Sequence, residues 1–293
     1  MKSTVQALAL ASMAGVPIAV ATGAAEQRPP ELLARNGKWV LNVDRDSCQL
    51  IAQFGEGDAM VMAKFTQFEP DAHFDLALIG KRMRHDAANG EAKLDFGLSA
   101  APIRADVMNG NLGKWPAAFI SSVRLDGWRA EKFGDVGPEI TPAQVSAVSG
   151  MTLRMGGKRA FRLDFGSLGK PFAQLRGCAT NLLHGWGYDQ RVQATLLRPV
   201  APITPPATWL ESGDYPHMPL MMGQGGFVQF RFDVDVEGKV AGCYILERTS
   251  PDQFADTVCR VLTKRARFQP ALDERGKAVR SYFVSKVKFV MPG

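Results

Sequence analysis

Four cysteines, Cys48, Cys178, Cys243 and Cys259, are the residues of this sequence with the most reactive side chains. They show no C-x-x-C spacing, and no histidine stands near them at metal-ligand spacing. The pattern therefore indicates neither a zinc site nor a dithiol redox motif. In an oxidising compartment four cysteines can form two disulfides in three ways. At this point the sequence leaves the pairing open.

Other reactive residue types occur without the partners that catalysis needs. The four histidines, His73, His85, His184 and His217, have no companions at triad or metal-ligand spacing. The tripeptide DFG occurs at 95–97 and 164–166, but the other kinase motifs are missing, so strand ends followed by turns are the expected meaning. We predict a protein that is not an enzyme and that carries no cofactor or metal.

The charge balance favours acidic partners only weakly. Lysine and arginine exceed aspartate and glutamate by 35 − 29 = 6, which is a mild basic excess. Aromatic residues do not alternate with the basic ones as they do where bases stack, so no nucleic-acid partner is expected. Basic residues gather at positions 260–280, which is typical of a solvated helix face, with acidic envelope polymers as the alternative partner.

The first 25 residues have the pattern of a secretory signal peptide. One lysine precedes an Ala-rich apolar stretch, and small residues fit cleavage after Ala25. An uncleaved membrane anchor is the alternative, because residues 5–25 are long enough to cross a bilayer. Residues 26–37 contain two prolines and are predicted to form a tether. The mature protein should therefore be exported.

Residues 38–197 are predicted to form a β-rich domain, sandwich or barrel-like, that ends in a helix. Short runs of alternating polarity are separated by turn residues, and the glycines at 156–157 mark a tight hairpin. Thr141, followed by a proline, is expected to cap a short helix. A longer helix with one apolar stripe is expected over residues 171–186, and it should pack on the β domain.

The Pro-rich residues 198–208 are predicted to be an extended linker. Beyond it, residues 209–293 are predicted to form a small layer in the order helix, strand, strand, helix, strand, so the whole chain is α+β. The strand over residues 228–236 has apolar residues on one side and polar residues on the other, and one buried face is expected. The last strand spans residues 278–290.

Residues 209–292 also carry an ordered series of short motifs. Tyr215 and Pro216 come first, residues 225–240 read GGFVQFRFDVDVEGKV, and RARFQPA contains Phe268 and Pro270. In this order the motifs resemble the TonB C-terminal domain, the periplasmic end of Gram-negative energy transducers. The resemblance implies a three-stranded antiparallel sheet with helices, in a periplasmic protein.

The resemblance further implies that an extended segment of an outer-membrane TonB-dependent receptor adds as a strand beside the last strand of the sheet. In this chain that edge is residues 280–288. The candidate peptide-binding residues are Arg280, Tyr282, Phe283, Val284 and Lys286. Lys286 and Lys288 fit equally well as charges that protect an open edge from unwanted pairing.

Transducers of this family work with an inner-membrane motor, ExbB with ExbD, which the resemblance adds as candidate partners. They begin with an anchor helix that carries a histidine, and a long Pro-rich span follows. This chain has no histidine in residues 1–25 and a folded domain in place of most of the span. Two functions therefore stay open. One is a periplasmic protein that binds extended peptides and supports TonB-dependent energy transduction and transport across the outer membrane; the other is a soluble cell-envelope interaction module without motor coupling.

The resemblance also implies a pairing of the cysteines. Cys243 occupies a position where the family usually has an aliphatic residue facing the helix, and Cys259 lies on the apolar stripe of that helix. The implied disulfide joins Cys243 to Cys259, and Cys48 then pairs with Cys178. Two buried free cysteines in this domain are the alternative.

Overall fold

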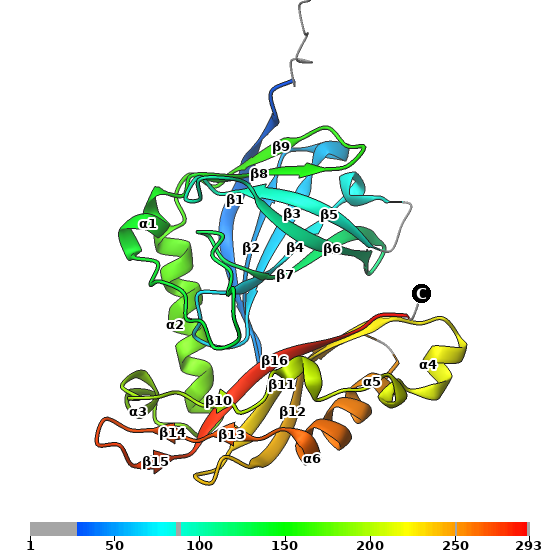
Figure 1. Cartoon of the computed structure of the whole chain (residues 1–293). Helices are drawn as coiled ribbons and strands as arrows, with labels where there is room; N and C mark the ends of the chain where they lie inside the picture. Colours follow the sequence, from blue (N-terminus) through cyan, green and yellow to red (C-terminus); the bar gives the residue numbers. More distant parts are fainter. Residues whose placement is uncertain (1–27, 86–88, 250, 292–293) are drawn as a thin grey trace, which may run out of the picture.

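Alternating apolar and polar residues close the first half of the chain into a β barrel (Figure 1). The structure is a computed structural model that describes residues 28–85, 89–249 and 251–291. Within these residues, nine strands form the barrel in the order β1-β2-β3-β4-β7-β6-β5-β8-β9. Their bounds are β1 Glu31–Val43, β2 Cys48–Phe54, β3 Val61–Gln67, β4 Phe74–Ile79, β5 Asn89–Asp95, β6 Ile103–Leu112, β7 Trp115–Val123, β8 Gly150–Met155 and β9 Phe161–Asp164.

β1 is the strand that closes the barrel. Its first residues pair in parallel with β9, and the remainder pairs antiparallel with β2. A register shift between Asn36 and Val40 marks an irregularity, and such bulges bend a strand. The barrel alternative is therefore the correct one and the sandwich is wrong, because this one bent strand joins two edges that a sandwich would leave open.

The predicted tether over residues 26–37 is wrong from residue 31 onward, because β1 begins at Glu31. Leu33 is 3% exposed within the barrel core, and the Glu31 carboxylate receives two hydrogen bonds from Arg82. A polar segment with one inward leucine has the sequence pattern of a linker, but β9 and β2 give it strand partners in space. The predicted signal peptide, residues 1–25, lies outside the described residues.

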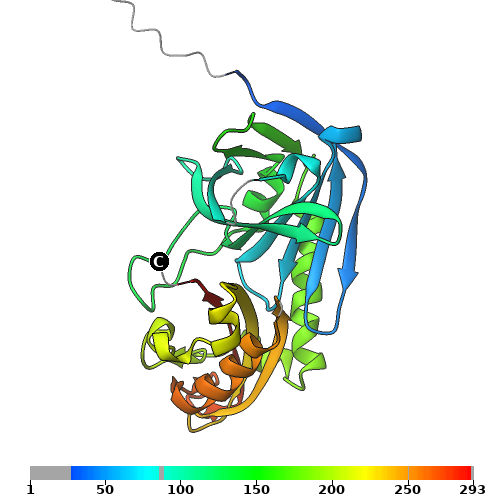
Figure 2. The same ribbon diagram turned by 90° about the vertical axis from the view of Figure 1, so that its right-hand side faces the viewer.

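Helix α2, Gly169–Gly185, connects the barrel with the rest of the molecule (Figures 1 and 2). Its apolar stripe packs into the barrel, where the Phe172 ring contacts those of Phe65 and Phe74. The short helix α1, Pro142–Ala147, precedes it, and the predicted cap at Thr141 is present as a capping box. Two 3₁₀ turns, η1 Gly57–Ala59 and η2 Lys81–Met83, and the short helix α3, Gln190–Ala194, complete this half.

The Pro-rich linker does not run free as an extended spacer. Its residues form β10, Ala201–Pro202, which pairs with β13, Phe268–Gln269, and the 3₁₀ turn η3, Pro206–Thr208. Trp209, directly after η3, is 2% exposed and packs edge-on against the ring of Phe268. Apolar side chains among the prolines thus attach this segment to the C-terminal half.

The C-terminal half, residues 209–291, has a three-stranded antiparallel sheet in the order β12-β11-β16 with helices on one face. The predicted order of helix, strand, strand, helix, strand is confirmed by α4, β11, β12, α5 and β16, and two small two-stranded sheets, β10-β13 and β14-β15, are additions. The bounds are η4 Ser212–Asp214, α4 His217–Met221, β11 Gly226–Val234, β12 Val240–Arg248, α5 Gln253–Thr257, η5 (a π-helical turn) Val258–Leu262, α6 Thr263–Arg265, β14 Ala271–Leu272, β15 Ala278–Val279 and β16 Ser281–Phe289.

Candidate functional site

β16 is an outer strand of the C-terminal sheet. It pairs with β11 along its whole length, and no other strand in the described part of the chain pairs with it. At its first residues, the side chains of Gln193 and Tyr188 donate hydrogen bonds to the carbonyl oxygens of Arg280 and Ser281. The rest of its outer edge presents backbone N–H and C=O groups that an added strand can use.

The two faces of β16 contact different parts of the molecule. Phe283, Val287 and Phe289 pack into the core beneath the helices. The alternate residues face the barrel, as their register opposite the polar side of β11 requires. Of the predicted binding residues, Phe283 is therefore a core residue, whereas Tyr282, Val284 and Lys286 share the barrel side of the strand.

Lys286 connects β16 to the outer wall of the barrel. Its ammonium group forms an ion pair with Asp75 of β4 and donates a hydrogen bond of 2.9 Å to Ser121 Oγ of β7. Lys288 is exposed. Lys286 is therefore not a free charge at an open edge, because its side chain binds Asp75 and Ser121 of the barrel.

The expectation of a single buried face on β11 is wrong. The polar residues Gln229, Arg231 and Asp233 are 7%, 4% and 9% exposed. They are buried because the barrel and the end of α2 cover this side of the sheet, as Figures 1 and 2 show. Local alternation of polarity cannot distinguish a wet face from a polar face that another domain covers.

The end of α2 carries two aromatic residues that hold this polar face. The guanidinium of Arg231 lies between the rings of Trp186 and Tyr244, and its Nε is 3.3 Å from Asp233 Oδ1. The one proton of the Tyr188 hydroxyl is shared between two acceptors, Asp233 Oδ1 at 2.8 Å and the Ser281 carbonyl oxygen at 3.0 Å. Burial, together with this carboxylate, raises the pKa of Tyr188, so its hydroxyl keeps the proton that it donates.

Acidic residues of the β3–β4 turn lie beside the same interface. Burial raises the pKa of Glu69 to about 8, with the Asp71 carboxylate adding to the effect. Burial also raises the pKa of Tyr282, to which Glu69 and Asp71 contribute. Both carboxyl groups of this turn line the same hollow as Val284 and Ser285 of β16.

A pocket of about 470 Å³ lies between the barrel and β16. Its walls include barrel residues of β6, β7 and the loop after β7, together with Phe227 of β11 and the two lysines of β16. A second hollow of about 300 Å³ adjoins Val284 and Ser285 of β16 and the β3–β4 turn. The outer part of β16 thus borders a cleft to which both halves of the molecule contribute.

The motif residues support the fold rather than the cleft. The Tyr215 hydroxyl donates a hydrogen bond to the Gln224 carbonyl oxygen, and its ring packs edge-on against those of Phe254 and Phe289. Pro216 is the N-cap of α4. Phe268 is 2% exposed, and Pro270 lies next to it against the β11–β12 turn.

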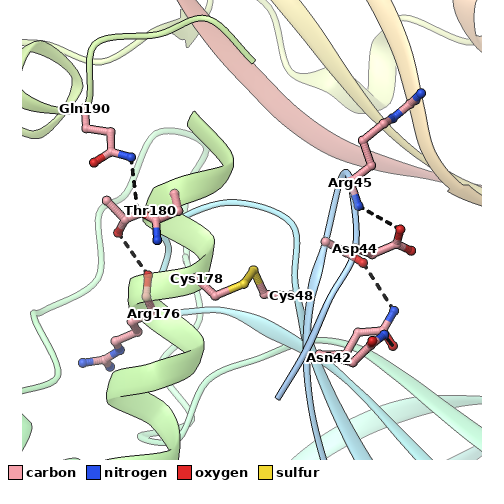
Figure 3. The surroundings of a disulfide bond; sticks show 11 residues. Asn42, Asp44, Arg45, Cys48, Arg176, Cys178, Thr180 and Gln190 are labelled. Atoms are coloured by element: carbon pink, nitrogen blue, oxygen red, sulfur yellow. Dashed lines mark hydrogen bonds between the residues drawn. A yellow bond between two sulfur atoms is a disulfide. The ribbon is translucent and has the colours of Figure 1, made fainter. Parts of the chain in front are cut away.

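Both implied disulfides are present. Cys243 of β12 is bonded to Cys259 of η5, and Cys48 of β2 is bonded to Cys178 of α2. Figure 3 shows the second bond, which joins α2 to the strand beside it. The free-cysteine alternative is therefore wrong for this structure, and the described residues include no unpaired cysteine. One disulfide fixes a helix on the C-terminal sheet, and the other fixes α2 on the barrel.

A scan against protein-family models matches residues 212–291 to the Gram-negative bacterial TonB protein C-terminal family. These residues form a TonB C-terminal domain. The matched range includes β11, β12 and β16 and the motif residues Tyr215 and Phe268. No curated protein matches the chain.

This domain is typical of TonB-like proteins of the Gram-negative cell envelope. Its family is a non-enzymatic one that serves energy transduction and interaction. None of the helices in the described part of the chain has the length and apolar character of a membrane span. No cluster of three or more His, Cys, Asp or Glu suited to a metal occurs in residues 28–85, 89–249 and 251–291.

Sequence reasoning did not find the barrel residues that surround the edge of the TonB C-terminal domain. Asp75 and Ser121 are outward residues of barrel strands, and such residues look solvated in any strand pattern. The signal that was available is the pair Trp186 and Tyr188, two aromatic side chains at a helix end, of which Trp186 is the last residue of the stripe that packs on the barrel and Tyr188 lies beyond it. Aromatic residues at such a position are typical of an interface.

Proposed function

We propose that this protein binds extended peptides by strand addition at the outer edge of β16. The observation that carries the proposal is that, within the part of the chain that the structure describes, β16 pairs with β11 alone, while one of its faces packs on the core and the other contacts the barrel. Packing of this kind fixes the position and direction of β16. The backbone N–H and C=O groups on its outer edge remain for a partner strand to bind. The side chains of Tyr282, Val284 and Lys286 are on the barrel side of β16, where they would flank the barrel-facing side chains of an added strand. Arg280 lies at the start of the edge.

The proposed ligand is a segment of an outer-membrane TonB-dependent receptor, and the proposed role is support of TonB-dependent energy transduction and transport. Support comes from the family of the C-terminal domain. The proposed location is the periplasm, reached by a signal peptide over residues 1–25. ExbB and ExbD are the motor partners that this role requires.

One observation favours a second function, a soluble cell-envelope module without motor coupling. The C-terminal domain is docked on the barrel through Lys286, Arg231 and Tyr188. A domain that reaches across the periplasm at the end of a long span would need to be free of such contacts. In this second function the protein holds a receptor or envelope peptide without transmitting force.

A peptide titration tests strand addition. Ten-residue segments from the N-terminal ends of outer-membrane receptors are titrated into the mature chain by calorimetry, and backbone amides of β16 are followed by hydrogen exchange. We expect binding with added protection of amides in residues 282–288. Two control peptides carry N-methyl groups on alternate residues, one in each phase. Because main-chain bonds hold an added strand, at least one N-methylated peptide should lose binding while its side chains stay the same.

If no receptor segment binds a folded protein, or if both N-methylated peptides bind as well as the parent, strand addition is wrong. Fractionation then separates the two functions. Retention in the inner membrane with cross-links to ExbB and ExbD supports motor coupling. Release into the periplasmic extract without those cross-links supports the soluble module.

A further inference from the structure

The pocket beside β16 is built by both halves of the molecule. Four large side chains, each only partly buried, converge on it. Met108 and Phe119 come from β6 and β7, Trp128 from the loop after β7, and Phe227 from β11. Both views place that loop, drawn in green, near β16 (Figures 1 and 2). The TonB C-terminal domain alone would lack the first three, so the barrel supplies most of the apolar wall.

The position of the pocket relates it to a strand added at β16. Lys286 and Lys288, which line the pocket, are alternate residues on the barrel side of β16. Side chains of an added strand would alternate in the same way, and directly opposite residues lie about 5 Å apart. A side chain of the added strand that faces the barrel at the level of these two lysines would therefore enter the pocket.

The charge at the rim of the pocket determines which peptide residues are favoured near that side chain. Lys286 already has Asp75 as its ion-pair partner. Lys288 and Arg129 are exposed at the rim, where Asp106 is the carboxylate that opposes them, so the rim carries a net positive charge. A carboxylate two residues from the inserted side chain, on the same face of the added strand, would be attracted to this rim.

We propose that the barrel wall formed by Met108, Phe119 and Trp128 is a specificity pocket, which selects extended segments with one large apolar side chain and an acidic residue two positions from it. This inference rests on strand addition at β16 and adds the barrel as the second half of the binding site. It gives the barrel a function: the barrel reads a side chain of the peptide whose backbone β16 holds.

The probes for this pocket are ten-residue peptides with one varied position in an otherwise constant Thr, Ser and Glu background. The varied residue is Ala, Leu, Phe or Lys, and it is moved along the peptide in steps of one. Titration into the full mature chain should give one register in which Leu or Phe binds about tenfold more tightly than Ala, because burying the additional carbon atoms of the larger side chain favours binding. Lys in that register should bind no better than Ala.

Two pocket variants and one control locate the effect. Met108→Ser and Trp128→Ala should each bring the preference for Leu over Ala to within about twofold. Trp115→Ala is the matched control, because Trp115 is an exposed barrel tryptophan outside the pocket, and it should keep the preference. Trp128→Ala removes a ring beneath Arg124 and could disturb folding. Met108→Ser leaves that contact in place and tests the pocket independently.

The outcomes separate the two proposals. Peptides that protect the amides of β16 yet show the same preference in the parent and in both pocket variants overturn the specificity pocket and leave strand addition intact. The absence of binding by every peptide in the series and by the receptor segments overturns both. A preference that disappears in Trp115→Ala as well as in the pocket variants also overturns the assignment, because it would reflect the barrel as a whole.

Discussion

The guanidinium carbon of Arg231 lies 4.3 Å from the centroid of the Trp186 ring and 4.2 Å from that of Tyr244. A cation from the centre of the TonB C-terminal sheet is thus held between an aromatic ring of its own sheet and one at the end of a barrel-packed helix. Trp186 also packs edge-on against Tyr282 of β16. Trp186 therefore contacts both the central strand β11 and the candidate binding strand β16.

A double-mutant cycle with Trp186→Ala and Arg231→Gln should give a coupling of about 2 kcal/mol, because the pair is desolvated. The measurement is the free energy of unfolding by urea, with limited proteolysis of residues 195–208 as a probe of domain separation. Lys114 and Trp115 form the matched control, a cation over a ring at an exposed hairpin. Their cycle should give about 0.5 kcal/mol. Equal coupling in the two cycles would contradict the role of Trp186.

Glu69 should make the protein less stable as the pH rises. The pKa of this carboxyl is about 8 in the folded protein against an ordinary value of 4.5. Between pH 4.5 and 8 the folded state therefore binds more protons than the unfolded state, and stability falls as pH increases. Glu69→Gln removes the group that ionises and should be more stable than the parent at pH 8 by on the order of 1 kcal/mol, with no advantage at pH 4. Urea titrations at the two pH values check this; the same difference at both would count against it.

The two disulfides should contribute unequally to stability. In the chain-entropy model a crosslink removes more freedom from the unfolded chain when its loop is longer. The cysteines of the pair Cys243 and Cys259 are 16 residues apart, and those of the pair Cys48 and Cys178 are 130 apart. Replacing the first pair by alanine should cost about 3 kcal/mol and replacing the second roughly 5 kcal/mol. Denaturant unfolding of the two double variants gives the order, and the reverse order would speak against a denatured-state origin.

Residues that act within one element could be predicted from the sequence. Thr141 caps α1 because a hydroxyl followed by proline and, three residues on, by glutamine satisfies orphan backbone groups locally. The TonB-like order of elements and the partner of Cys243 follow from a motif series in consecutive residues. In each case the information lies within a short stretch of chain.

Relations between distant segments could not be predicted. The strand partner of Leu33 is β9, more than a hundred residues away, so a polar stretch with one inward-facing leucine does not by itself indicate barrel closure. Arg231 is polar in a strand that alternates, and its burial is caused by Trp186 of another element. The cleft beside β16 exists only because these long-range contacts place the barrel next to it.

The variant Lys288→Val tests whether an exposed charge keeps the edge of β16 from pairing with a second copy of the protein. Lys288→Val should increase self-association, because a charge at an open edge opposes strand pairing and valine favours it. Sedimentation velocity over a concentration series measures the change. Lys277→Val is the control, since this exposed lysine lies in the turn before β15. Similar self-association of both variants would show that the lost charge, not the edge, is responsible.

The β11–β12 turn and the β14–β15 turn share the same hydrogen bonds to an aspartate, and what surrounds the glycine differs between them. Asp235 and Asp273 each accept backbone hydrogen bonds from the residues two and four positions later through one carboxylate oxygen. Gly238 and Gly276, three positions after each aspartate, both have φ of +77°. This conformation favours glycine equally in the two turns.

Alanine at these two glycines therefore separates backbone strain from steric exclusion. A Cβ at Gly276 would meet nothing within 4 Å, whereas a Cβ at Gly238 would lie 1.9 Å from the carbonyl oxygen of Phe268. Gly276→Ala should cost about 1 kcal/mol, the ordinary strain of a left-handed alanine. Gly238→Ala should cost at least about 2 kcal/mol more, because β13 and the Phe268 motif must move away from the β11–β12 turn. Urea unfolding measures both, and equal losses would mean that the close approach of Phe268 to this turn is not required for the fold.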